Sequence, residues 1–310
     1  MAALGDGVLA NEPMSLHTSF RIGGPADLYA VATSAQELVE LVSLARERDI
    51  PYLIIGRGTN ILVADEGIRG LVIENGGQEI CFEQEIKGQA VLYAESGALL
   101  RDLARESARR GLGGLEWAVG IPGSVGGAIV GNAGAYDCYI GDVTRKATVL
   151  APDGTVRQLS AAEMGFGYRT SRFKGQAGQG EQEVILSAEF MLRPEPAQSL
   201  AERLADYTRR REASQPTEPS VGSIFKRTKQ YPAGFLIEQA GLKGTRIGGA
   251  QISPKHANFI VNLGPSTSSG QGQARAADVK ALIDLAQEQV RERFGQELEL
   301  EIELMGEWNG

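Results

Sequence analysis

The stretch of sequence that constrains the fold most is Gly120-Ile-Pro-Gly-Ser-Val-Gly-Gly-Ala128, with Asn132-Ala-Gly-Ala135 shortly after it. A run this rich in glycine and small residues buries little apolar area and is costly to order, so it would make a poor core by itself. A flexible loop is the alternative, but Ile121, Val125 and Ile129 are too apolar for a solvated linker. We therefore expect a long, flat ligand to lie against this backbone.

Helices and strands on both sides of this stretch form one predicted α+β unit, residues 86–197. Apolar residues at helical spacing predict a helix over Ala98–Arg110. Apolar runs broken by turn residues predict four strands: Ala90–Ala94, Thr148–Ala151, Val156–Leu159 and Val184–Arg193. The glycine-rich stretch lies between the predicted helix and the last three strands.

A smaller α+β unit, residues 1–85, is predicted before it. It begins with the strand Ala26–Thr33, and Ser34-Ala-Gln-Glu37 is a capping box that opens a helix. The buried strand Pro51–Ile55 follows and ends in a second glycine-containing motif.

That second motif is Gly56-Arg-Gly-Thr-Asn60. Its glycines allow consecutive N–H groups to converge into an anion-binding nest, and Thr59 and Asn60 add polar contacts suited to a pyrophosphate. It is neither a Rossmann fingerprint nor a phosphate loop, so no standard nucleotide-binding fold is indicated. A tight structural turn is an equal alternative at this point.

The remaining residues, 198–310, are expected to form a third α+β unit. Ser199-Leu-Ala-Glu202 has the pattern of a capping box at a helix start, and a second helix is predicted over Ala276–Phe294. From Glu297 to Leu304 glutamates alternate with apolar residues, which predicts a strand with one apolar face and one carboxylate face. Ser266–Gln273 is polar and contains glycine, so a surface loop is expected there.

Composition excludes several classes of function. The net charge of -8 disfavours nucleic-acid and anionic-membrane binding, because both need a broad positive field. Cys81 and Cys138 lie far apart in no metal-binding or disulfide pattern, so two ordinary thiols and no metal site are expected. No leader or membrane-spanning run is recognisable, which favours a cytoplasmic enzyme. His17 and His256, the two histidines, are expected to be structural.

Three further motifs carry chemical groups but lie far apart in the sequence. They are Tyr168-Arg169, Gly222-Ser-Ile-Phe-Lys226 and the carboxylate at Glu301. Each has an ordinary explanation: a surface charge, a turn residue and a solvated glutamate. Spacing alone does not assemble them into a site.

A resemblance connects these motifs. In chain order the sequence contains Thr18-Ser-Phe-Arg-Ile-Gly-Gly24, Gly56-Arg-Gly-Thr-Asn-Ile-Leu-Val63, Gly120-Ile-Pro-Gly-Ser-Val-Gly-Gly127, Asn132-Ala-Gly-Ala-Tyr136, Tyr168-Arg169, Gly222-Ser-Ile-Phe-Lys226, Ala240-Gly-Leu-Lys-Gly244 and Leu298-Glu-Leu-Glu-Ile302. Together they resemble the motifs of the UDP-N-acetylenolpyruvoylglucosamine reductase (MurB) family, in the shorter type that lacks a tyrosine-bearing lid. The match covers nearly the whole chain.

The resemblance implies a fold and a reaction. The fold would be α+β, with an FAD-binding domain of the vanillyl-alcohol oxidase (PCMH) type made of two subdomains, plus a C-terminal substrate-binding domain. The reaction would be the NADPH-dependent reduction of an enolpyruvyl UDP-sugar in peptidoglycan synthesis, with non-covalent FAD as cofactor. Hydride would be added at C3 of the enolpyruvyl group and a proton at C2. A monomer that binds UDP-sugar and NADPH, but neither nucleic acid nor membrane, is expected.

The resemblance also assigns residues. Ser223 would be the proton donor, and Arg169 and Glu301 would stabilise or orient the enolate-like intermediate. Substrate contacts would come from Tyr168, Lys226 and Arg227, although the family commonly has Asn-Pro where this chain has Arg227-Thr228. FAD would contact Gly56, Arg57, Gly58, Thr59, Asn60, Ile61, Gly120, Ile121, Pro122, Gly123, Ser124, Gly126, Gly127, Asn132, Ala133, Gly134 and Ala135.

A basic segment adds one inference that does not need the family. Between Lys226 and Lys255 the chain has six basic residues and one acid, Glu238, in a protein that is acidic overall. We expect this segment to attract the nucleotide diphosphate, and the NADPH 2′-phosphate as well. Two other functions stay open: a different flavin oxidoreductase on the same fold, such as an alcohol or sugar oxidase, and a flavin- or nucleotide-sugar-binding protein without turnover.

Overall fold

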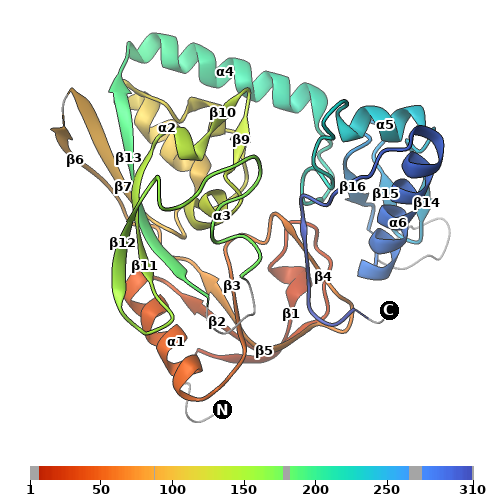
Figure 1. Cartoon of the computed structure of the whole chain (residues 1–310), viewed down its shortest axis with the longest axis horizontal. Helices are drawn as coiled ribbons and strands as arrows, with labels where there is room; N and C mark the ends of the chain where they lie inside the picture. The colour runs from red at the N-terminus through yellow and green to blue at the C-terminus, as the bar shows by residue number, and fades with distance from the viewer. Residues whose placement is uncertain (1–6, 87, 177–181, 265–273, 309–310) are drawn as a thin grey trace. The chain divides into compact units, whose positions relative to one another are not determined.

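The computed structural model describes residues 7–86, 88–176, 182–264 and 274–308 (Figure 1). The predicted loop Ser266–Gln273 lies outside these residues. The chain forms two compact units: one of Met1–Leu9, Leu28–Arg57 and Gly70–Arg211, the other of Ala10–Asp27, Gly58–Arg69 and Glu212–Gly310. Each unit is therefore built from separate stretches of sequence, and the three-domain division with boundaries after residues 85 and 197 stays a prediction.

The N-terminal part of the first unit is a helix on a small sheet. Strands β2 (Pro25–Ala32), β5 (Ile68–Asn75) and β3 (Tyr52–Ile55) are neighbours in this order, and β3 pairs with β5 in parallel. Helix α1 (Ala35–Glu47) begins as predicted, because the Ser34 side chain accepts a hydrogen bond from the Glu37 N–H at 3.2 Å. Leu38 and Val42 of α1 are fully buried and bind the helix to this sheet.

A larger antiparallel sheet forms the rest of the first unit (Figure 1). Its strand order is β12 (Val156–Ser160), β11 (Thr144–Leu150), β13 (Val184–Pro194), β7 (Gln89–Glu95) and β6 (Ile80–Ile86), and the two-residue β8 (Leu112–Gly113) also pairs with β13. Strands β7, β11, β12 and β13 confirm the predicted strands. Strand β6 was not predicted.

Two helices pack on this sheet through one apolar core. They are α2 (Leu100–Arg109), close to its predicted bounds, and the short α3 (Val125–Val130), which lies inside the glycine-rich stretch. Leu103 and Ile129 from these helices are fully buried together with Phe190 of β13. The glycine-rich stretch is thus anchored by apolar residues that belong to the hydrophobic core of this sheet.

Helix α4 (Ala197–Ser214) corrects one prediction. It begins two residues before Ser199, which therefore lies inside the helix and not at its N-cap. Pro196 directly precedes the helix, and its carbonyl accepts from the Leu200 N–H at 3.2 Å. The Ser-x-x-Glu pattern therefore does not mark the start of this helix, because the same pattern can also occur inside one.

The second unit has its own helices, strands and core. A three-stranded sheet in the order β14 (Arg246–Ile247), β15 (Ala250–Ile252) and β16 (Ile260–Asn262) packs with α5 (Ala233–Gln239) and α6 (Ala276–Phe294). Helix α6 has the predicted bounds and ends at Gly295, whose φ is 62°. Shorter elements of the chain are β1 (Leu9–Pro13) and the 3-10 turn Met14–Leu16, and, in the first unit, β9 (Gly134–Ala135), β10 (Cys138–Tyr139) and the 3-10 turns Glu116–Ala118 and Ile140–Asp142.

The predicted carboxylate strand is shorter than expected. Only β17 (Glu303–Met305) is a strand, and it pairs in parallel with β4 (Ile61–Val63). Upstream, Leu300 forms an isolated bridge with Phe225. The predicted alternation holds in part, because Leu298 and Ile302 of the apolar face are buried, whereas Leu300 and Leu304 are half-buried. The segment is interrupted because it changes partner between Leu300 and Glu303.

Candidate active site

The two glycine motifs of the first unit meet at Gly56 and Ser124. A Cβ placed on Gly56 would lie 2.3 Å from the Ser124 Oγ, far inside van der Waals contact. Ser124 is buried and is the N-cap of α3, where its Oγ accepts from the Gly127 N–H at 3.4 Å. Two backbone runs that the sequence separates by 60 residues or more therefore lie against one another.

Two glycines of the second motif lie in close contact with other parts of the protein. A Cβ on Gly126 would lie 3.1 Å from the Cβ of Ser96, and one on Gly120 would lie 2.3 Å from the Cδ of Arg211. The N–H groups of Val125 and Gly126 donate to Ala98 and Ser96, at 2.9 and 2.7 Å. These two N–H groups are already bonded, so Gly126 can serve a ligand by close approach only.

The remaining predicted contacts of this unit are mostly held in local structure. Ile121 N–H donates to Ala118, the Gly123 carbonyl accepts from Leu100, and Ala133 N–H donates to Ala128. Gly134 and Ala135 form β9, and a Cβ on Gly134 would lie 2.3 Å from the Tyr139 ring. Pro122 lies between Ile121 and Gly123. The exposed side chain of Arg57 pairs with Glu74 at 3.1 Å.

Asn132 has a structural task that the sequence did not indicate. It is buried, its φ is 41°, and its side chain bridges two segments: Nδ2 donates to the Gly167 carbonyl at 2.8 Å and Oδ1 accepts from the Gly141 N–H at 3.1 Å. Gly167 begins the turn that presents Tyr168 and Arg169. Asn132 therefore fastens that turn to the glycine-rich stretch.

Arg169 occupies a strained position in this turn. The Gly167 and Thr170 backbones bond to each other in both directions, at 3.0 and 3.3 Å, and Arg169 between them has a φ of 54°. A left-handed backbone at a residue other than glycine costs about 1–3 kcal/mol and occurs most often at functional sites. The Arg169 guanidinium lies 5.6 Å from the centroid of the Tyr168 ring, and Tyr168 is exposed. Both predicted residues are thus held by one tight turn.

Sequence reasoning missed Arg211, in the last turn of α4. It is half-buried, whereas Arg209 and Arg210 beside it are exposed. Burial lowers the pKa of Arg211, the nearby Tyr136 opposes this, and the positive charge of Arg169 lowers the pKa further. Two guanidinium groups of the first unit therefore act on each other beside Gly120. Their repulsion is relieved by an anion.

Tyr136 belongs to the same cluster. It lies in the tight turn between β9 and β10, where Tyr136 and Asp137 have φ values of 55° and 60°, the left-handed pair of a hairpin turn. Its ring stacks on Tyr207 of α4 with centroids 4.4 Å apart, and its hydroxyl donates to the Tyr207 carbonyl at 3.3 Å. The hairpin is therefore docked onto the helix that carries Arg211.

In the second unit, the Ser223 segment and the Glu301 segment are hydrogen-bonded to each other. Phe225 bridges Leu300, the Glu301 N–H donates to the Ile224 carbonyl at 2.8 Å, and the Lys226 N–H donates to the Glu299 carbonyl at 2.8 Å. Residues that are 73 to 77 positions apart in the sequence are thereby neighbours. Ser223 and Glu301 are both half-buried.

This pairing distinguishes Glu301 from the other carboxylates of the segment. Glu297 and Glu299 are exposed, and Glu299 forms an ion pair with Lys226. Glu303 is half-buried and its N–H donates to the Asn60 carbonyl at 3.0 Å. Of the four glutamates, only Glu301 directly follows Leu300, which forms the bridge with Phe225. The four glutamates are therefore not equivalent, which the alternation pattern could not reveal.

Asn60 connects the first glycine motif to Glu301 within the second unit. Its Nδ2 donates to the Glu301 carbonyl at 3.2 Å, and Ile61 immediately after it enters β4 and pairs with Glu303. Thr59 precedes it, and Gly58 has a φ of 57°, with the His17 carbonyl 2.3 Å from where a Cβ would be. Part of the motif predicted to bind pyrophosphate thus also supports the Glu301 segment.

The basic segment is less positive than its sequence suggests. Lys226 pairs with Glu299, Lys243 pairs with Glu238 at 2.8 Å, and the Lys255 ammonium donates to the Glu212 carbonyl at 2.6 Å. Glu299 comes from outside the segment, so counting charges along the sequence overstated the local field. The exposed side chains of Arg227 and Lys229 are the ones best placed to meet an anion in solution.

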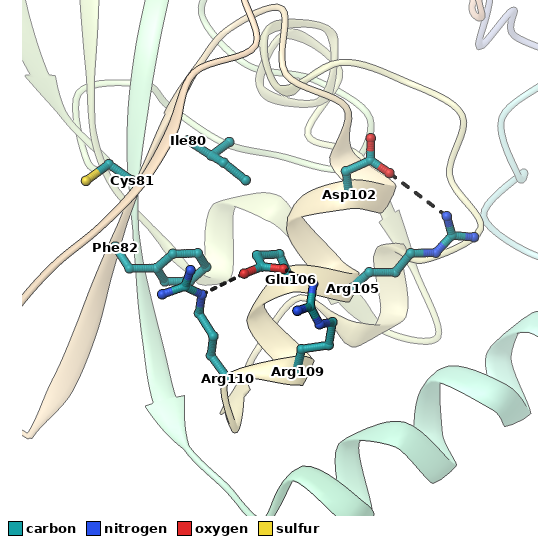
Figure 2. A pocket seen from close by; sticks show the side chains of 8 residues that line it. All are labelled: Ile80, Cys81, Phe82, Asp102, Arg105, Glu106, Arg109 and Arg110. Atoms are coloured by element: carbon teal, nitrogen blue, oxygen red, sulfur yellow. Dashed lines mark hydrogen bonds and ion pairs between the residues drawn. The ribbon is translucent and has the colours of Figure 1, made fainter.

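A hollow of about 630 Å³ lies elsewhere in the first unit, between α2 and β6 (Figure 2). Three arginines and two carboxylates of α2 line it and are paired with one another: Glu106 pairs with Arg109 at 2.7 Å and with Arg110 at 2.8 Å. The Arg110 guanidinium also lies over the Phe82 ring at 4.1 Å. None of the predicted site residues lines this hollow, so the hollow is not a candidate active site.

Two kinds of site are not found in the described part of the chain. No group of three or more His, Cys, Asp or Glu side chains there could hold a metal ion. Among the helices of the described residues, none has the length and apolar character needed to cross a membrane. Cys81 and Cys138 are both free thiols, and His17 pairs with Glu12 at 2.9 Å.

Comparison with known proteins identifies relatives over nearly the whole chain. Two family models match: an FAD binding domain over residues 26–160, and the C-terminal domain of UDP-N-acetylenolpyruvoylglucosamine reductase over residues 215–305. The reductase of Clostridium botulinum is 42% identical over 97% of this chain and 94% of its own length. A second reductase of that name, from Symbiobacterium thermophilum, is 43% identical over 95% of this chain and 91% of its own.

A solved structure shows the same fold. The crystal structure of UDP-N-acetylenolpyruvylglucosamine reductase from Thermus caldophilus is 35% identical, with a TM-score of 0.76, and the match covers 96% of this chain and 98% of that one. The expected fold class, with an FAD-binding region followed by a C-terminal domain, is confirmed by these matches.

Proposed function

The chain belongs to the UDP-N-acetylenolpyruvoylglucosamine reductase family, and we propose that it reduces the enolpyruvyl ether of UDP-N-acetylenolpyruvoylglucosamine to UDP-N-acetylmuramate with NADPH. The observation that carries this proposal is the hydrogen-bonded pairing of the Ser223 and Glu301 segments. This pairing joins the segments that carry a hydroxyl and a carboxylate, and groups of these two kinds suit proton delivery to a substrate carbanion. The reaction belongs to peptidoglycan precursor synthesis.

The cofactor of this proposal is non-covalent FAD. Gly56 lies against Ser124 and Gly120 against Arg211 so closely that neither position has room for a Cβ. Backbone without side chains of its own suits a flat ring and a pyrophosphate. Gly56–Val63 contains neither His nor Cys to attach a flavin covalently. Held there, FAD would supply the hydride-transfer chemistry that connects NADPH to the enolpyruvyl C3.

Arg169 and Arg211 would bind the substrate carboxylate. Hydride addition at C3 moves negative charge toward that carboxylate, so fixed guanidinium groups stabilise the transition state more than the ground state. The strained backbone of Arg169 and the burial of Arg211 both limit how far these groups can move. Preorganised cations are worth more than mobile ones, since no reorganisation is needed during the reaction.

Ser223 would donate the proton to C2, and Glu301 would orient the intermediate. A serine hydroxyl is a weak acid, so it protonates only a strongly basic carbanion held within hydrogen-bond reach. Lys226 stands three residues later in the same segment, where its positive charge favours the alkoxide that the donor leaves behind. The serine should therefore matter in the second half-reaction alone.

The nucleotide part of the substrate would be met by Tyr168, Lys226 and Arg227, with Lys229 nearby. Arg227 and Lys229 are exposed, and the charge of Lys226 is shared with Glu299. Raising the salt concentration should therefore weaken binding of the UDP-sugar and of NADPH, because screening reduces attraction between exposed charges. We further propose FAD-binding subdomains at 1–85 and 86–197, a substrate domain at 198–310, and a cytoplasmic monomer.

The test separates the two half-reactions in Ser223→Ala. We expect NADPH to bleach the flavin absorbance of this variant at the normal rate, whereas the enolpyruvyl UDP-sugar should no longer restore it. General acid catalysis contributes about 10²–10⁴-fold, so the loss should be easily measured. Ser220→Ala is the matched control, because Ser220 lies three residues earlier and its carbonyl, which the substitution keeps, accepts from the Ser19 hydroxyl at 2.7 Å.

Each alternative gives a different result. If both half-reactions of Ser223→Ala ran normally, the proton donor would be another group. An oxidase would be reoxidised by oxygen and would ignore the enolpyruvyl sugar. A binding protein without turnover would take up FAD but would not oxidise NADPH when the sugar nucleotide is added.

A further inference from the structure

Asn258 attaches to the backbone directly after Ser223. It is buried, and its side chain makes two bonds with a single residue: Oδ1 accepts from the Phe225 N–H at 3.0 Å, and Nδ2 donates to the Phe225 carbonyl at 2.8 Å. The Asn258 carbonyl also accepts from the Ile224 N–H at 2.8 Å. Three hydrogen bonds thus join one asparagine to the two residues that follow the proposed proton donor.

These bonds complete a frame whose other side is the Glu301 segment. The Ile224 carbonyl accepts from the Glu301 N–H, and the Lys226 N–H donates to the Glu299 carbonyl. Asn258 therefore takes the place of a second neighbouring strand, with its amide imitating a peptide group. Every peptide group from Ile224 to Lys226 is bonded on at least one side, so this backbone has little freedom to shift.

Burial makes the bonds costly to lose. Phe225 is 2% exposed and Asn258 is 7% exposed, so water cannot readily replace a missing partner. A buried backbone group left without a hydrogen bond costs about 1–3 kcal/mol. If the Asn258 side chain were lost, we expect the segment to shift so that the Phe225 N–H and carbonyl find new partners, and Ser223 would shift with it.

Asn258 is itself held from behind. Its N–H donates to the Nδ1 of His256 at 3.2 Å, and the His256 ring packs edge-on against Phe259 with centroids 4.8 Å apart. Burial holds the pKa of His256 below its ordinary value, which favours the neutral imidazole that can accept at Nδ1. Hydrogen bonds therefore connect His256 through Asn258 to Phe225.

We propose that Asn258 is a positioning residue for the reaction: its amide fixes the Phe225 peptide and thereby sets the Ser223 hydroxyl at the distance from the substrate C2 that proton transfer needs. This inference rests on the proposed role of Ser223. It predicts that Asn258 acts on the second half-reaction and leaves the first unchanged.

The test uses Asn258→Ala and Asn258→Asp in the FAD-loaded, full-length protein. NADPH should bleach the flavin absorbance of both at the wild-type rate. The enolpyruvyl UDP-sugar should restore it about tenfold to a hundredfold more slowly, since a misplacement of about 1 Å can cost a hundredfold in rate. Aspartate keeps the acceptor for the Phe225 N–H but faces its carbonyl with an oxygen, so it also tests the donor bond.

Asn262→Ala is the matched control. Asn262 lies in the same unit and is only 4% exposed, and its Nδ2 donates to the carbonyl of Phe20 at 3.0 Å. Replacing it should therefore lower the stability of the protein in a similar way. It has no bond to the Ser223 segment in the described structure. We expect Asn262→Ala to keep the wild-type ratio of the two half-reaction rates.

A second readout does not depend on turnover. Hydrogen exchange of the Phe225 amide in the protein without substrate should be slow in the wild type and faster in Asn258→Ala, with the Glu301 amide less affected. If Ser223→Ala slows flavin reoxidation but the Asn258 variants do not, the positioning role is wrong and the proposed function stands. If Ser223→Ala itself reoxidises normally, Ser223 is not the proton donor, and the positioning role of Asn258 is wrong with it. Equal slowing by Asn262→Ala would reduce Asn258 to a stabilising residue.

Discussion

The contact between Gly56 and Ser124 gives the sharpest test of the cofactor site. Gly56 has a backbone conformation that alanine can adopt, but its Cβ would lie 2.3 Å from the Ser124 Oγ and 3.1 Å from the Ser124 Cβ. Either the two glycine motifs separate, or the serine rotates and abandons the Gly127 N–H that it caps. Overpacking of this kind costs about 1–3 kcal/mol, and loss of an N-cap costs about 1 kcal/mol.

We expect Gly56→Ala to weaken FAD binding about tenfold to a hundredfold, because each factor of ten corresponds to about 1.4 kcal/mol. The assay is titration of the apoprotein with FAD, followed by quenching of flavin fluorescence. In the double variant Gly56→Ala with Ser124→Ala the nearest atom is removed, so part of the affinity should return despite the lost cap. Two contacting residues should be non-additive in this way.

Gly131→Ala is the control for this cycle. Its Cβ would meet its nearest neighbour, the Gly127 carbonyl oxygen, at an ordinary 3.6 Å, so FAD affinity should stay close to that of the wild type. Wild-type affinity in Gly56→Ala, or a double variant no better than the single one, would refute the claim that the two motifs jointly hold the flavin.

Two further predictions concern the anion cluster and the stability of the fold. Arg211→Ala should slow flavin reoxidation by the enolpyruvyl sugar about tenfold to a hundredfold, which corresponds to a loss of roughly 1.4–2.8 kcal/mol of transition-state stabilisation. Bleaching of the flavin by NADPH, followed by stopped flow, should stay normal in this variant. In the control Arg209→Ala, which changes an exposed arginine, both half-reactions should stay normal. Gly67→Ala should lower the free energy of unfolding by about 3 kcal/mol or more, since its φ is 87° and its Cβ would lie 1.8 Å from a backbone carbonyl. Thermal melting against Gly154→Ala, which has the same kind of backbone but open space around its Cβ, isolates the steric part.

Local patterns predicted most of the regular structure. Helix α6 begins at Ala276 and ends at Phe294 as expected, because its apolar spacing and the following Gly295 are both local signals. Strand β6 escaped notice because the acidic residues Glu83 and Glu85 interrupt its apolar pattern. It is stabilised by pairing with β7, which is a property of the sheet and not of the segment.

The candidate site divides in the same way. The glycine motifs, Tyr168-Arg169 and Ser223 are recognisable as short motifs, so resemblance to a family could indicate them. Arg211 could not be singled out, because it is one of three consecutive arginines. Only the folded structure shows that Arg211 is half-buried while Arg209 and Arg210 are exposed. The Ser223–Glu301 pairing likewise depends on a backbone bridge between distant segments. The roles of Asn132 and Asn258 need the partners of their amide groups to be known.

An anaerobic titration of the protein reconstituted with FAD decides whether this chain is a flavin reductase acting on an enolpyruvyl sugar nucleotide. We expect uptake of FAD at one equivalent per chain, complete bleaching by NADPH, and stoichiometric return of the flavin absorbance on addition of UDP-N-acetylenolpyruvoylglucosamine, with UDP-N-acetylmuramate as the product. A protein that stays colourless in excess FAD, or a bleached flavin that the sugar nucleotide leaves unchanged, would show that the chain does not catalyse this reaction.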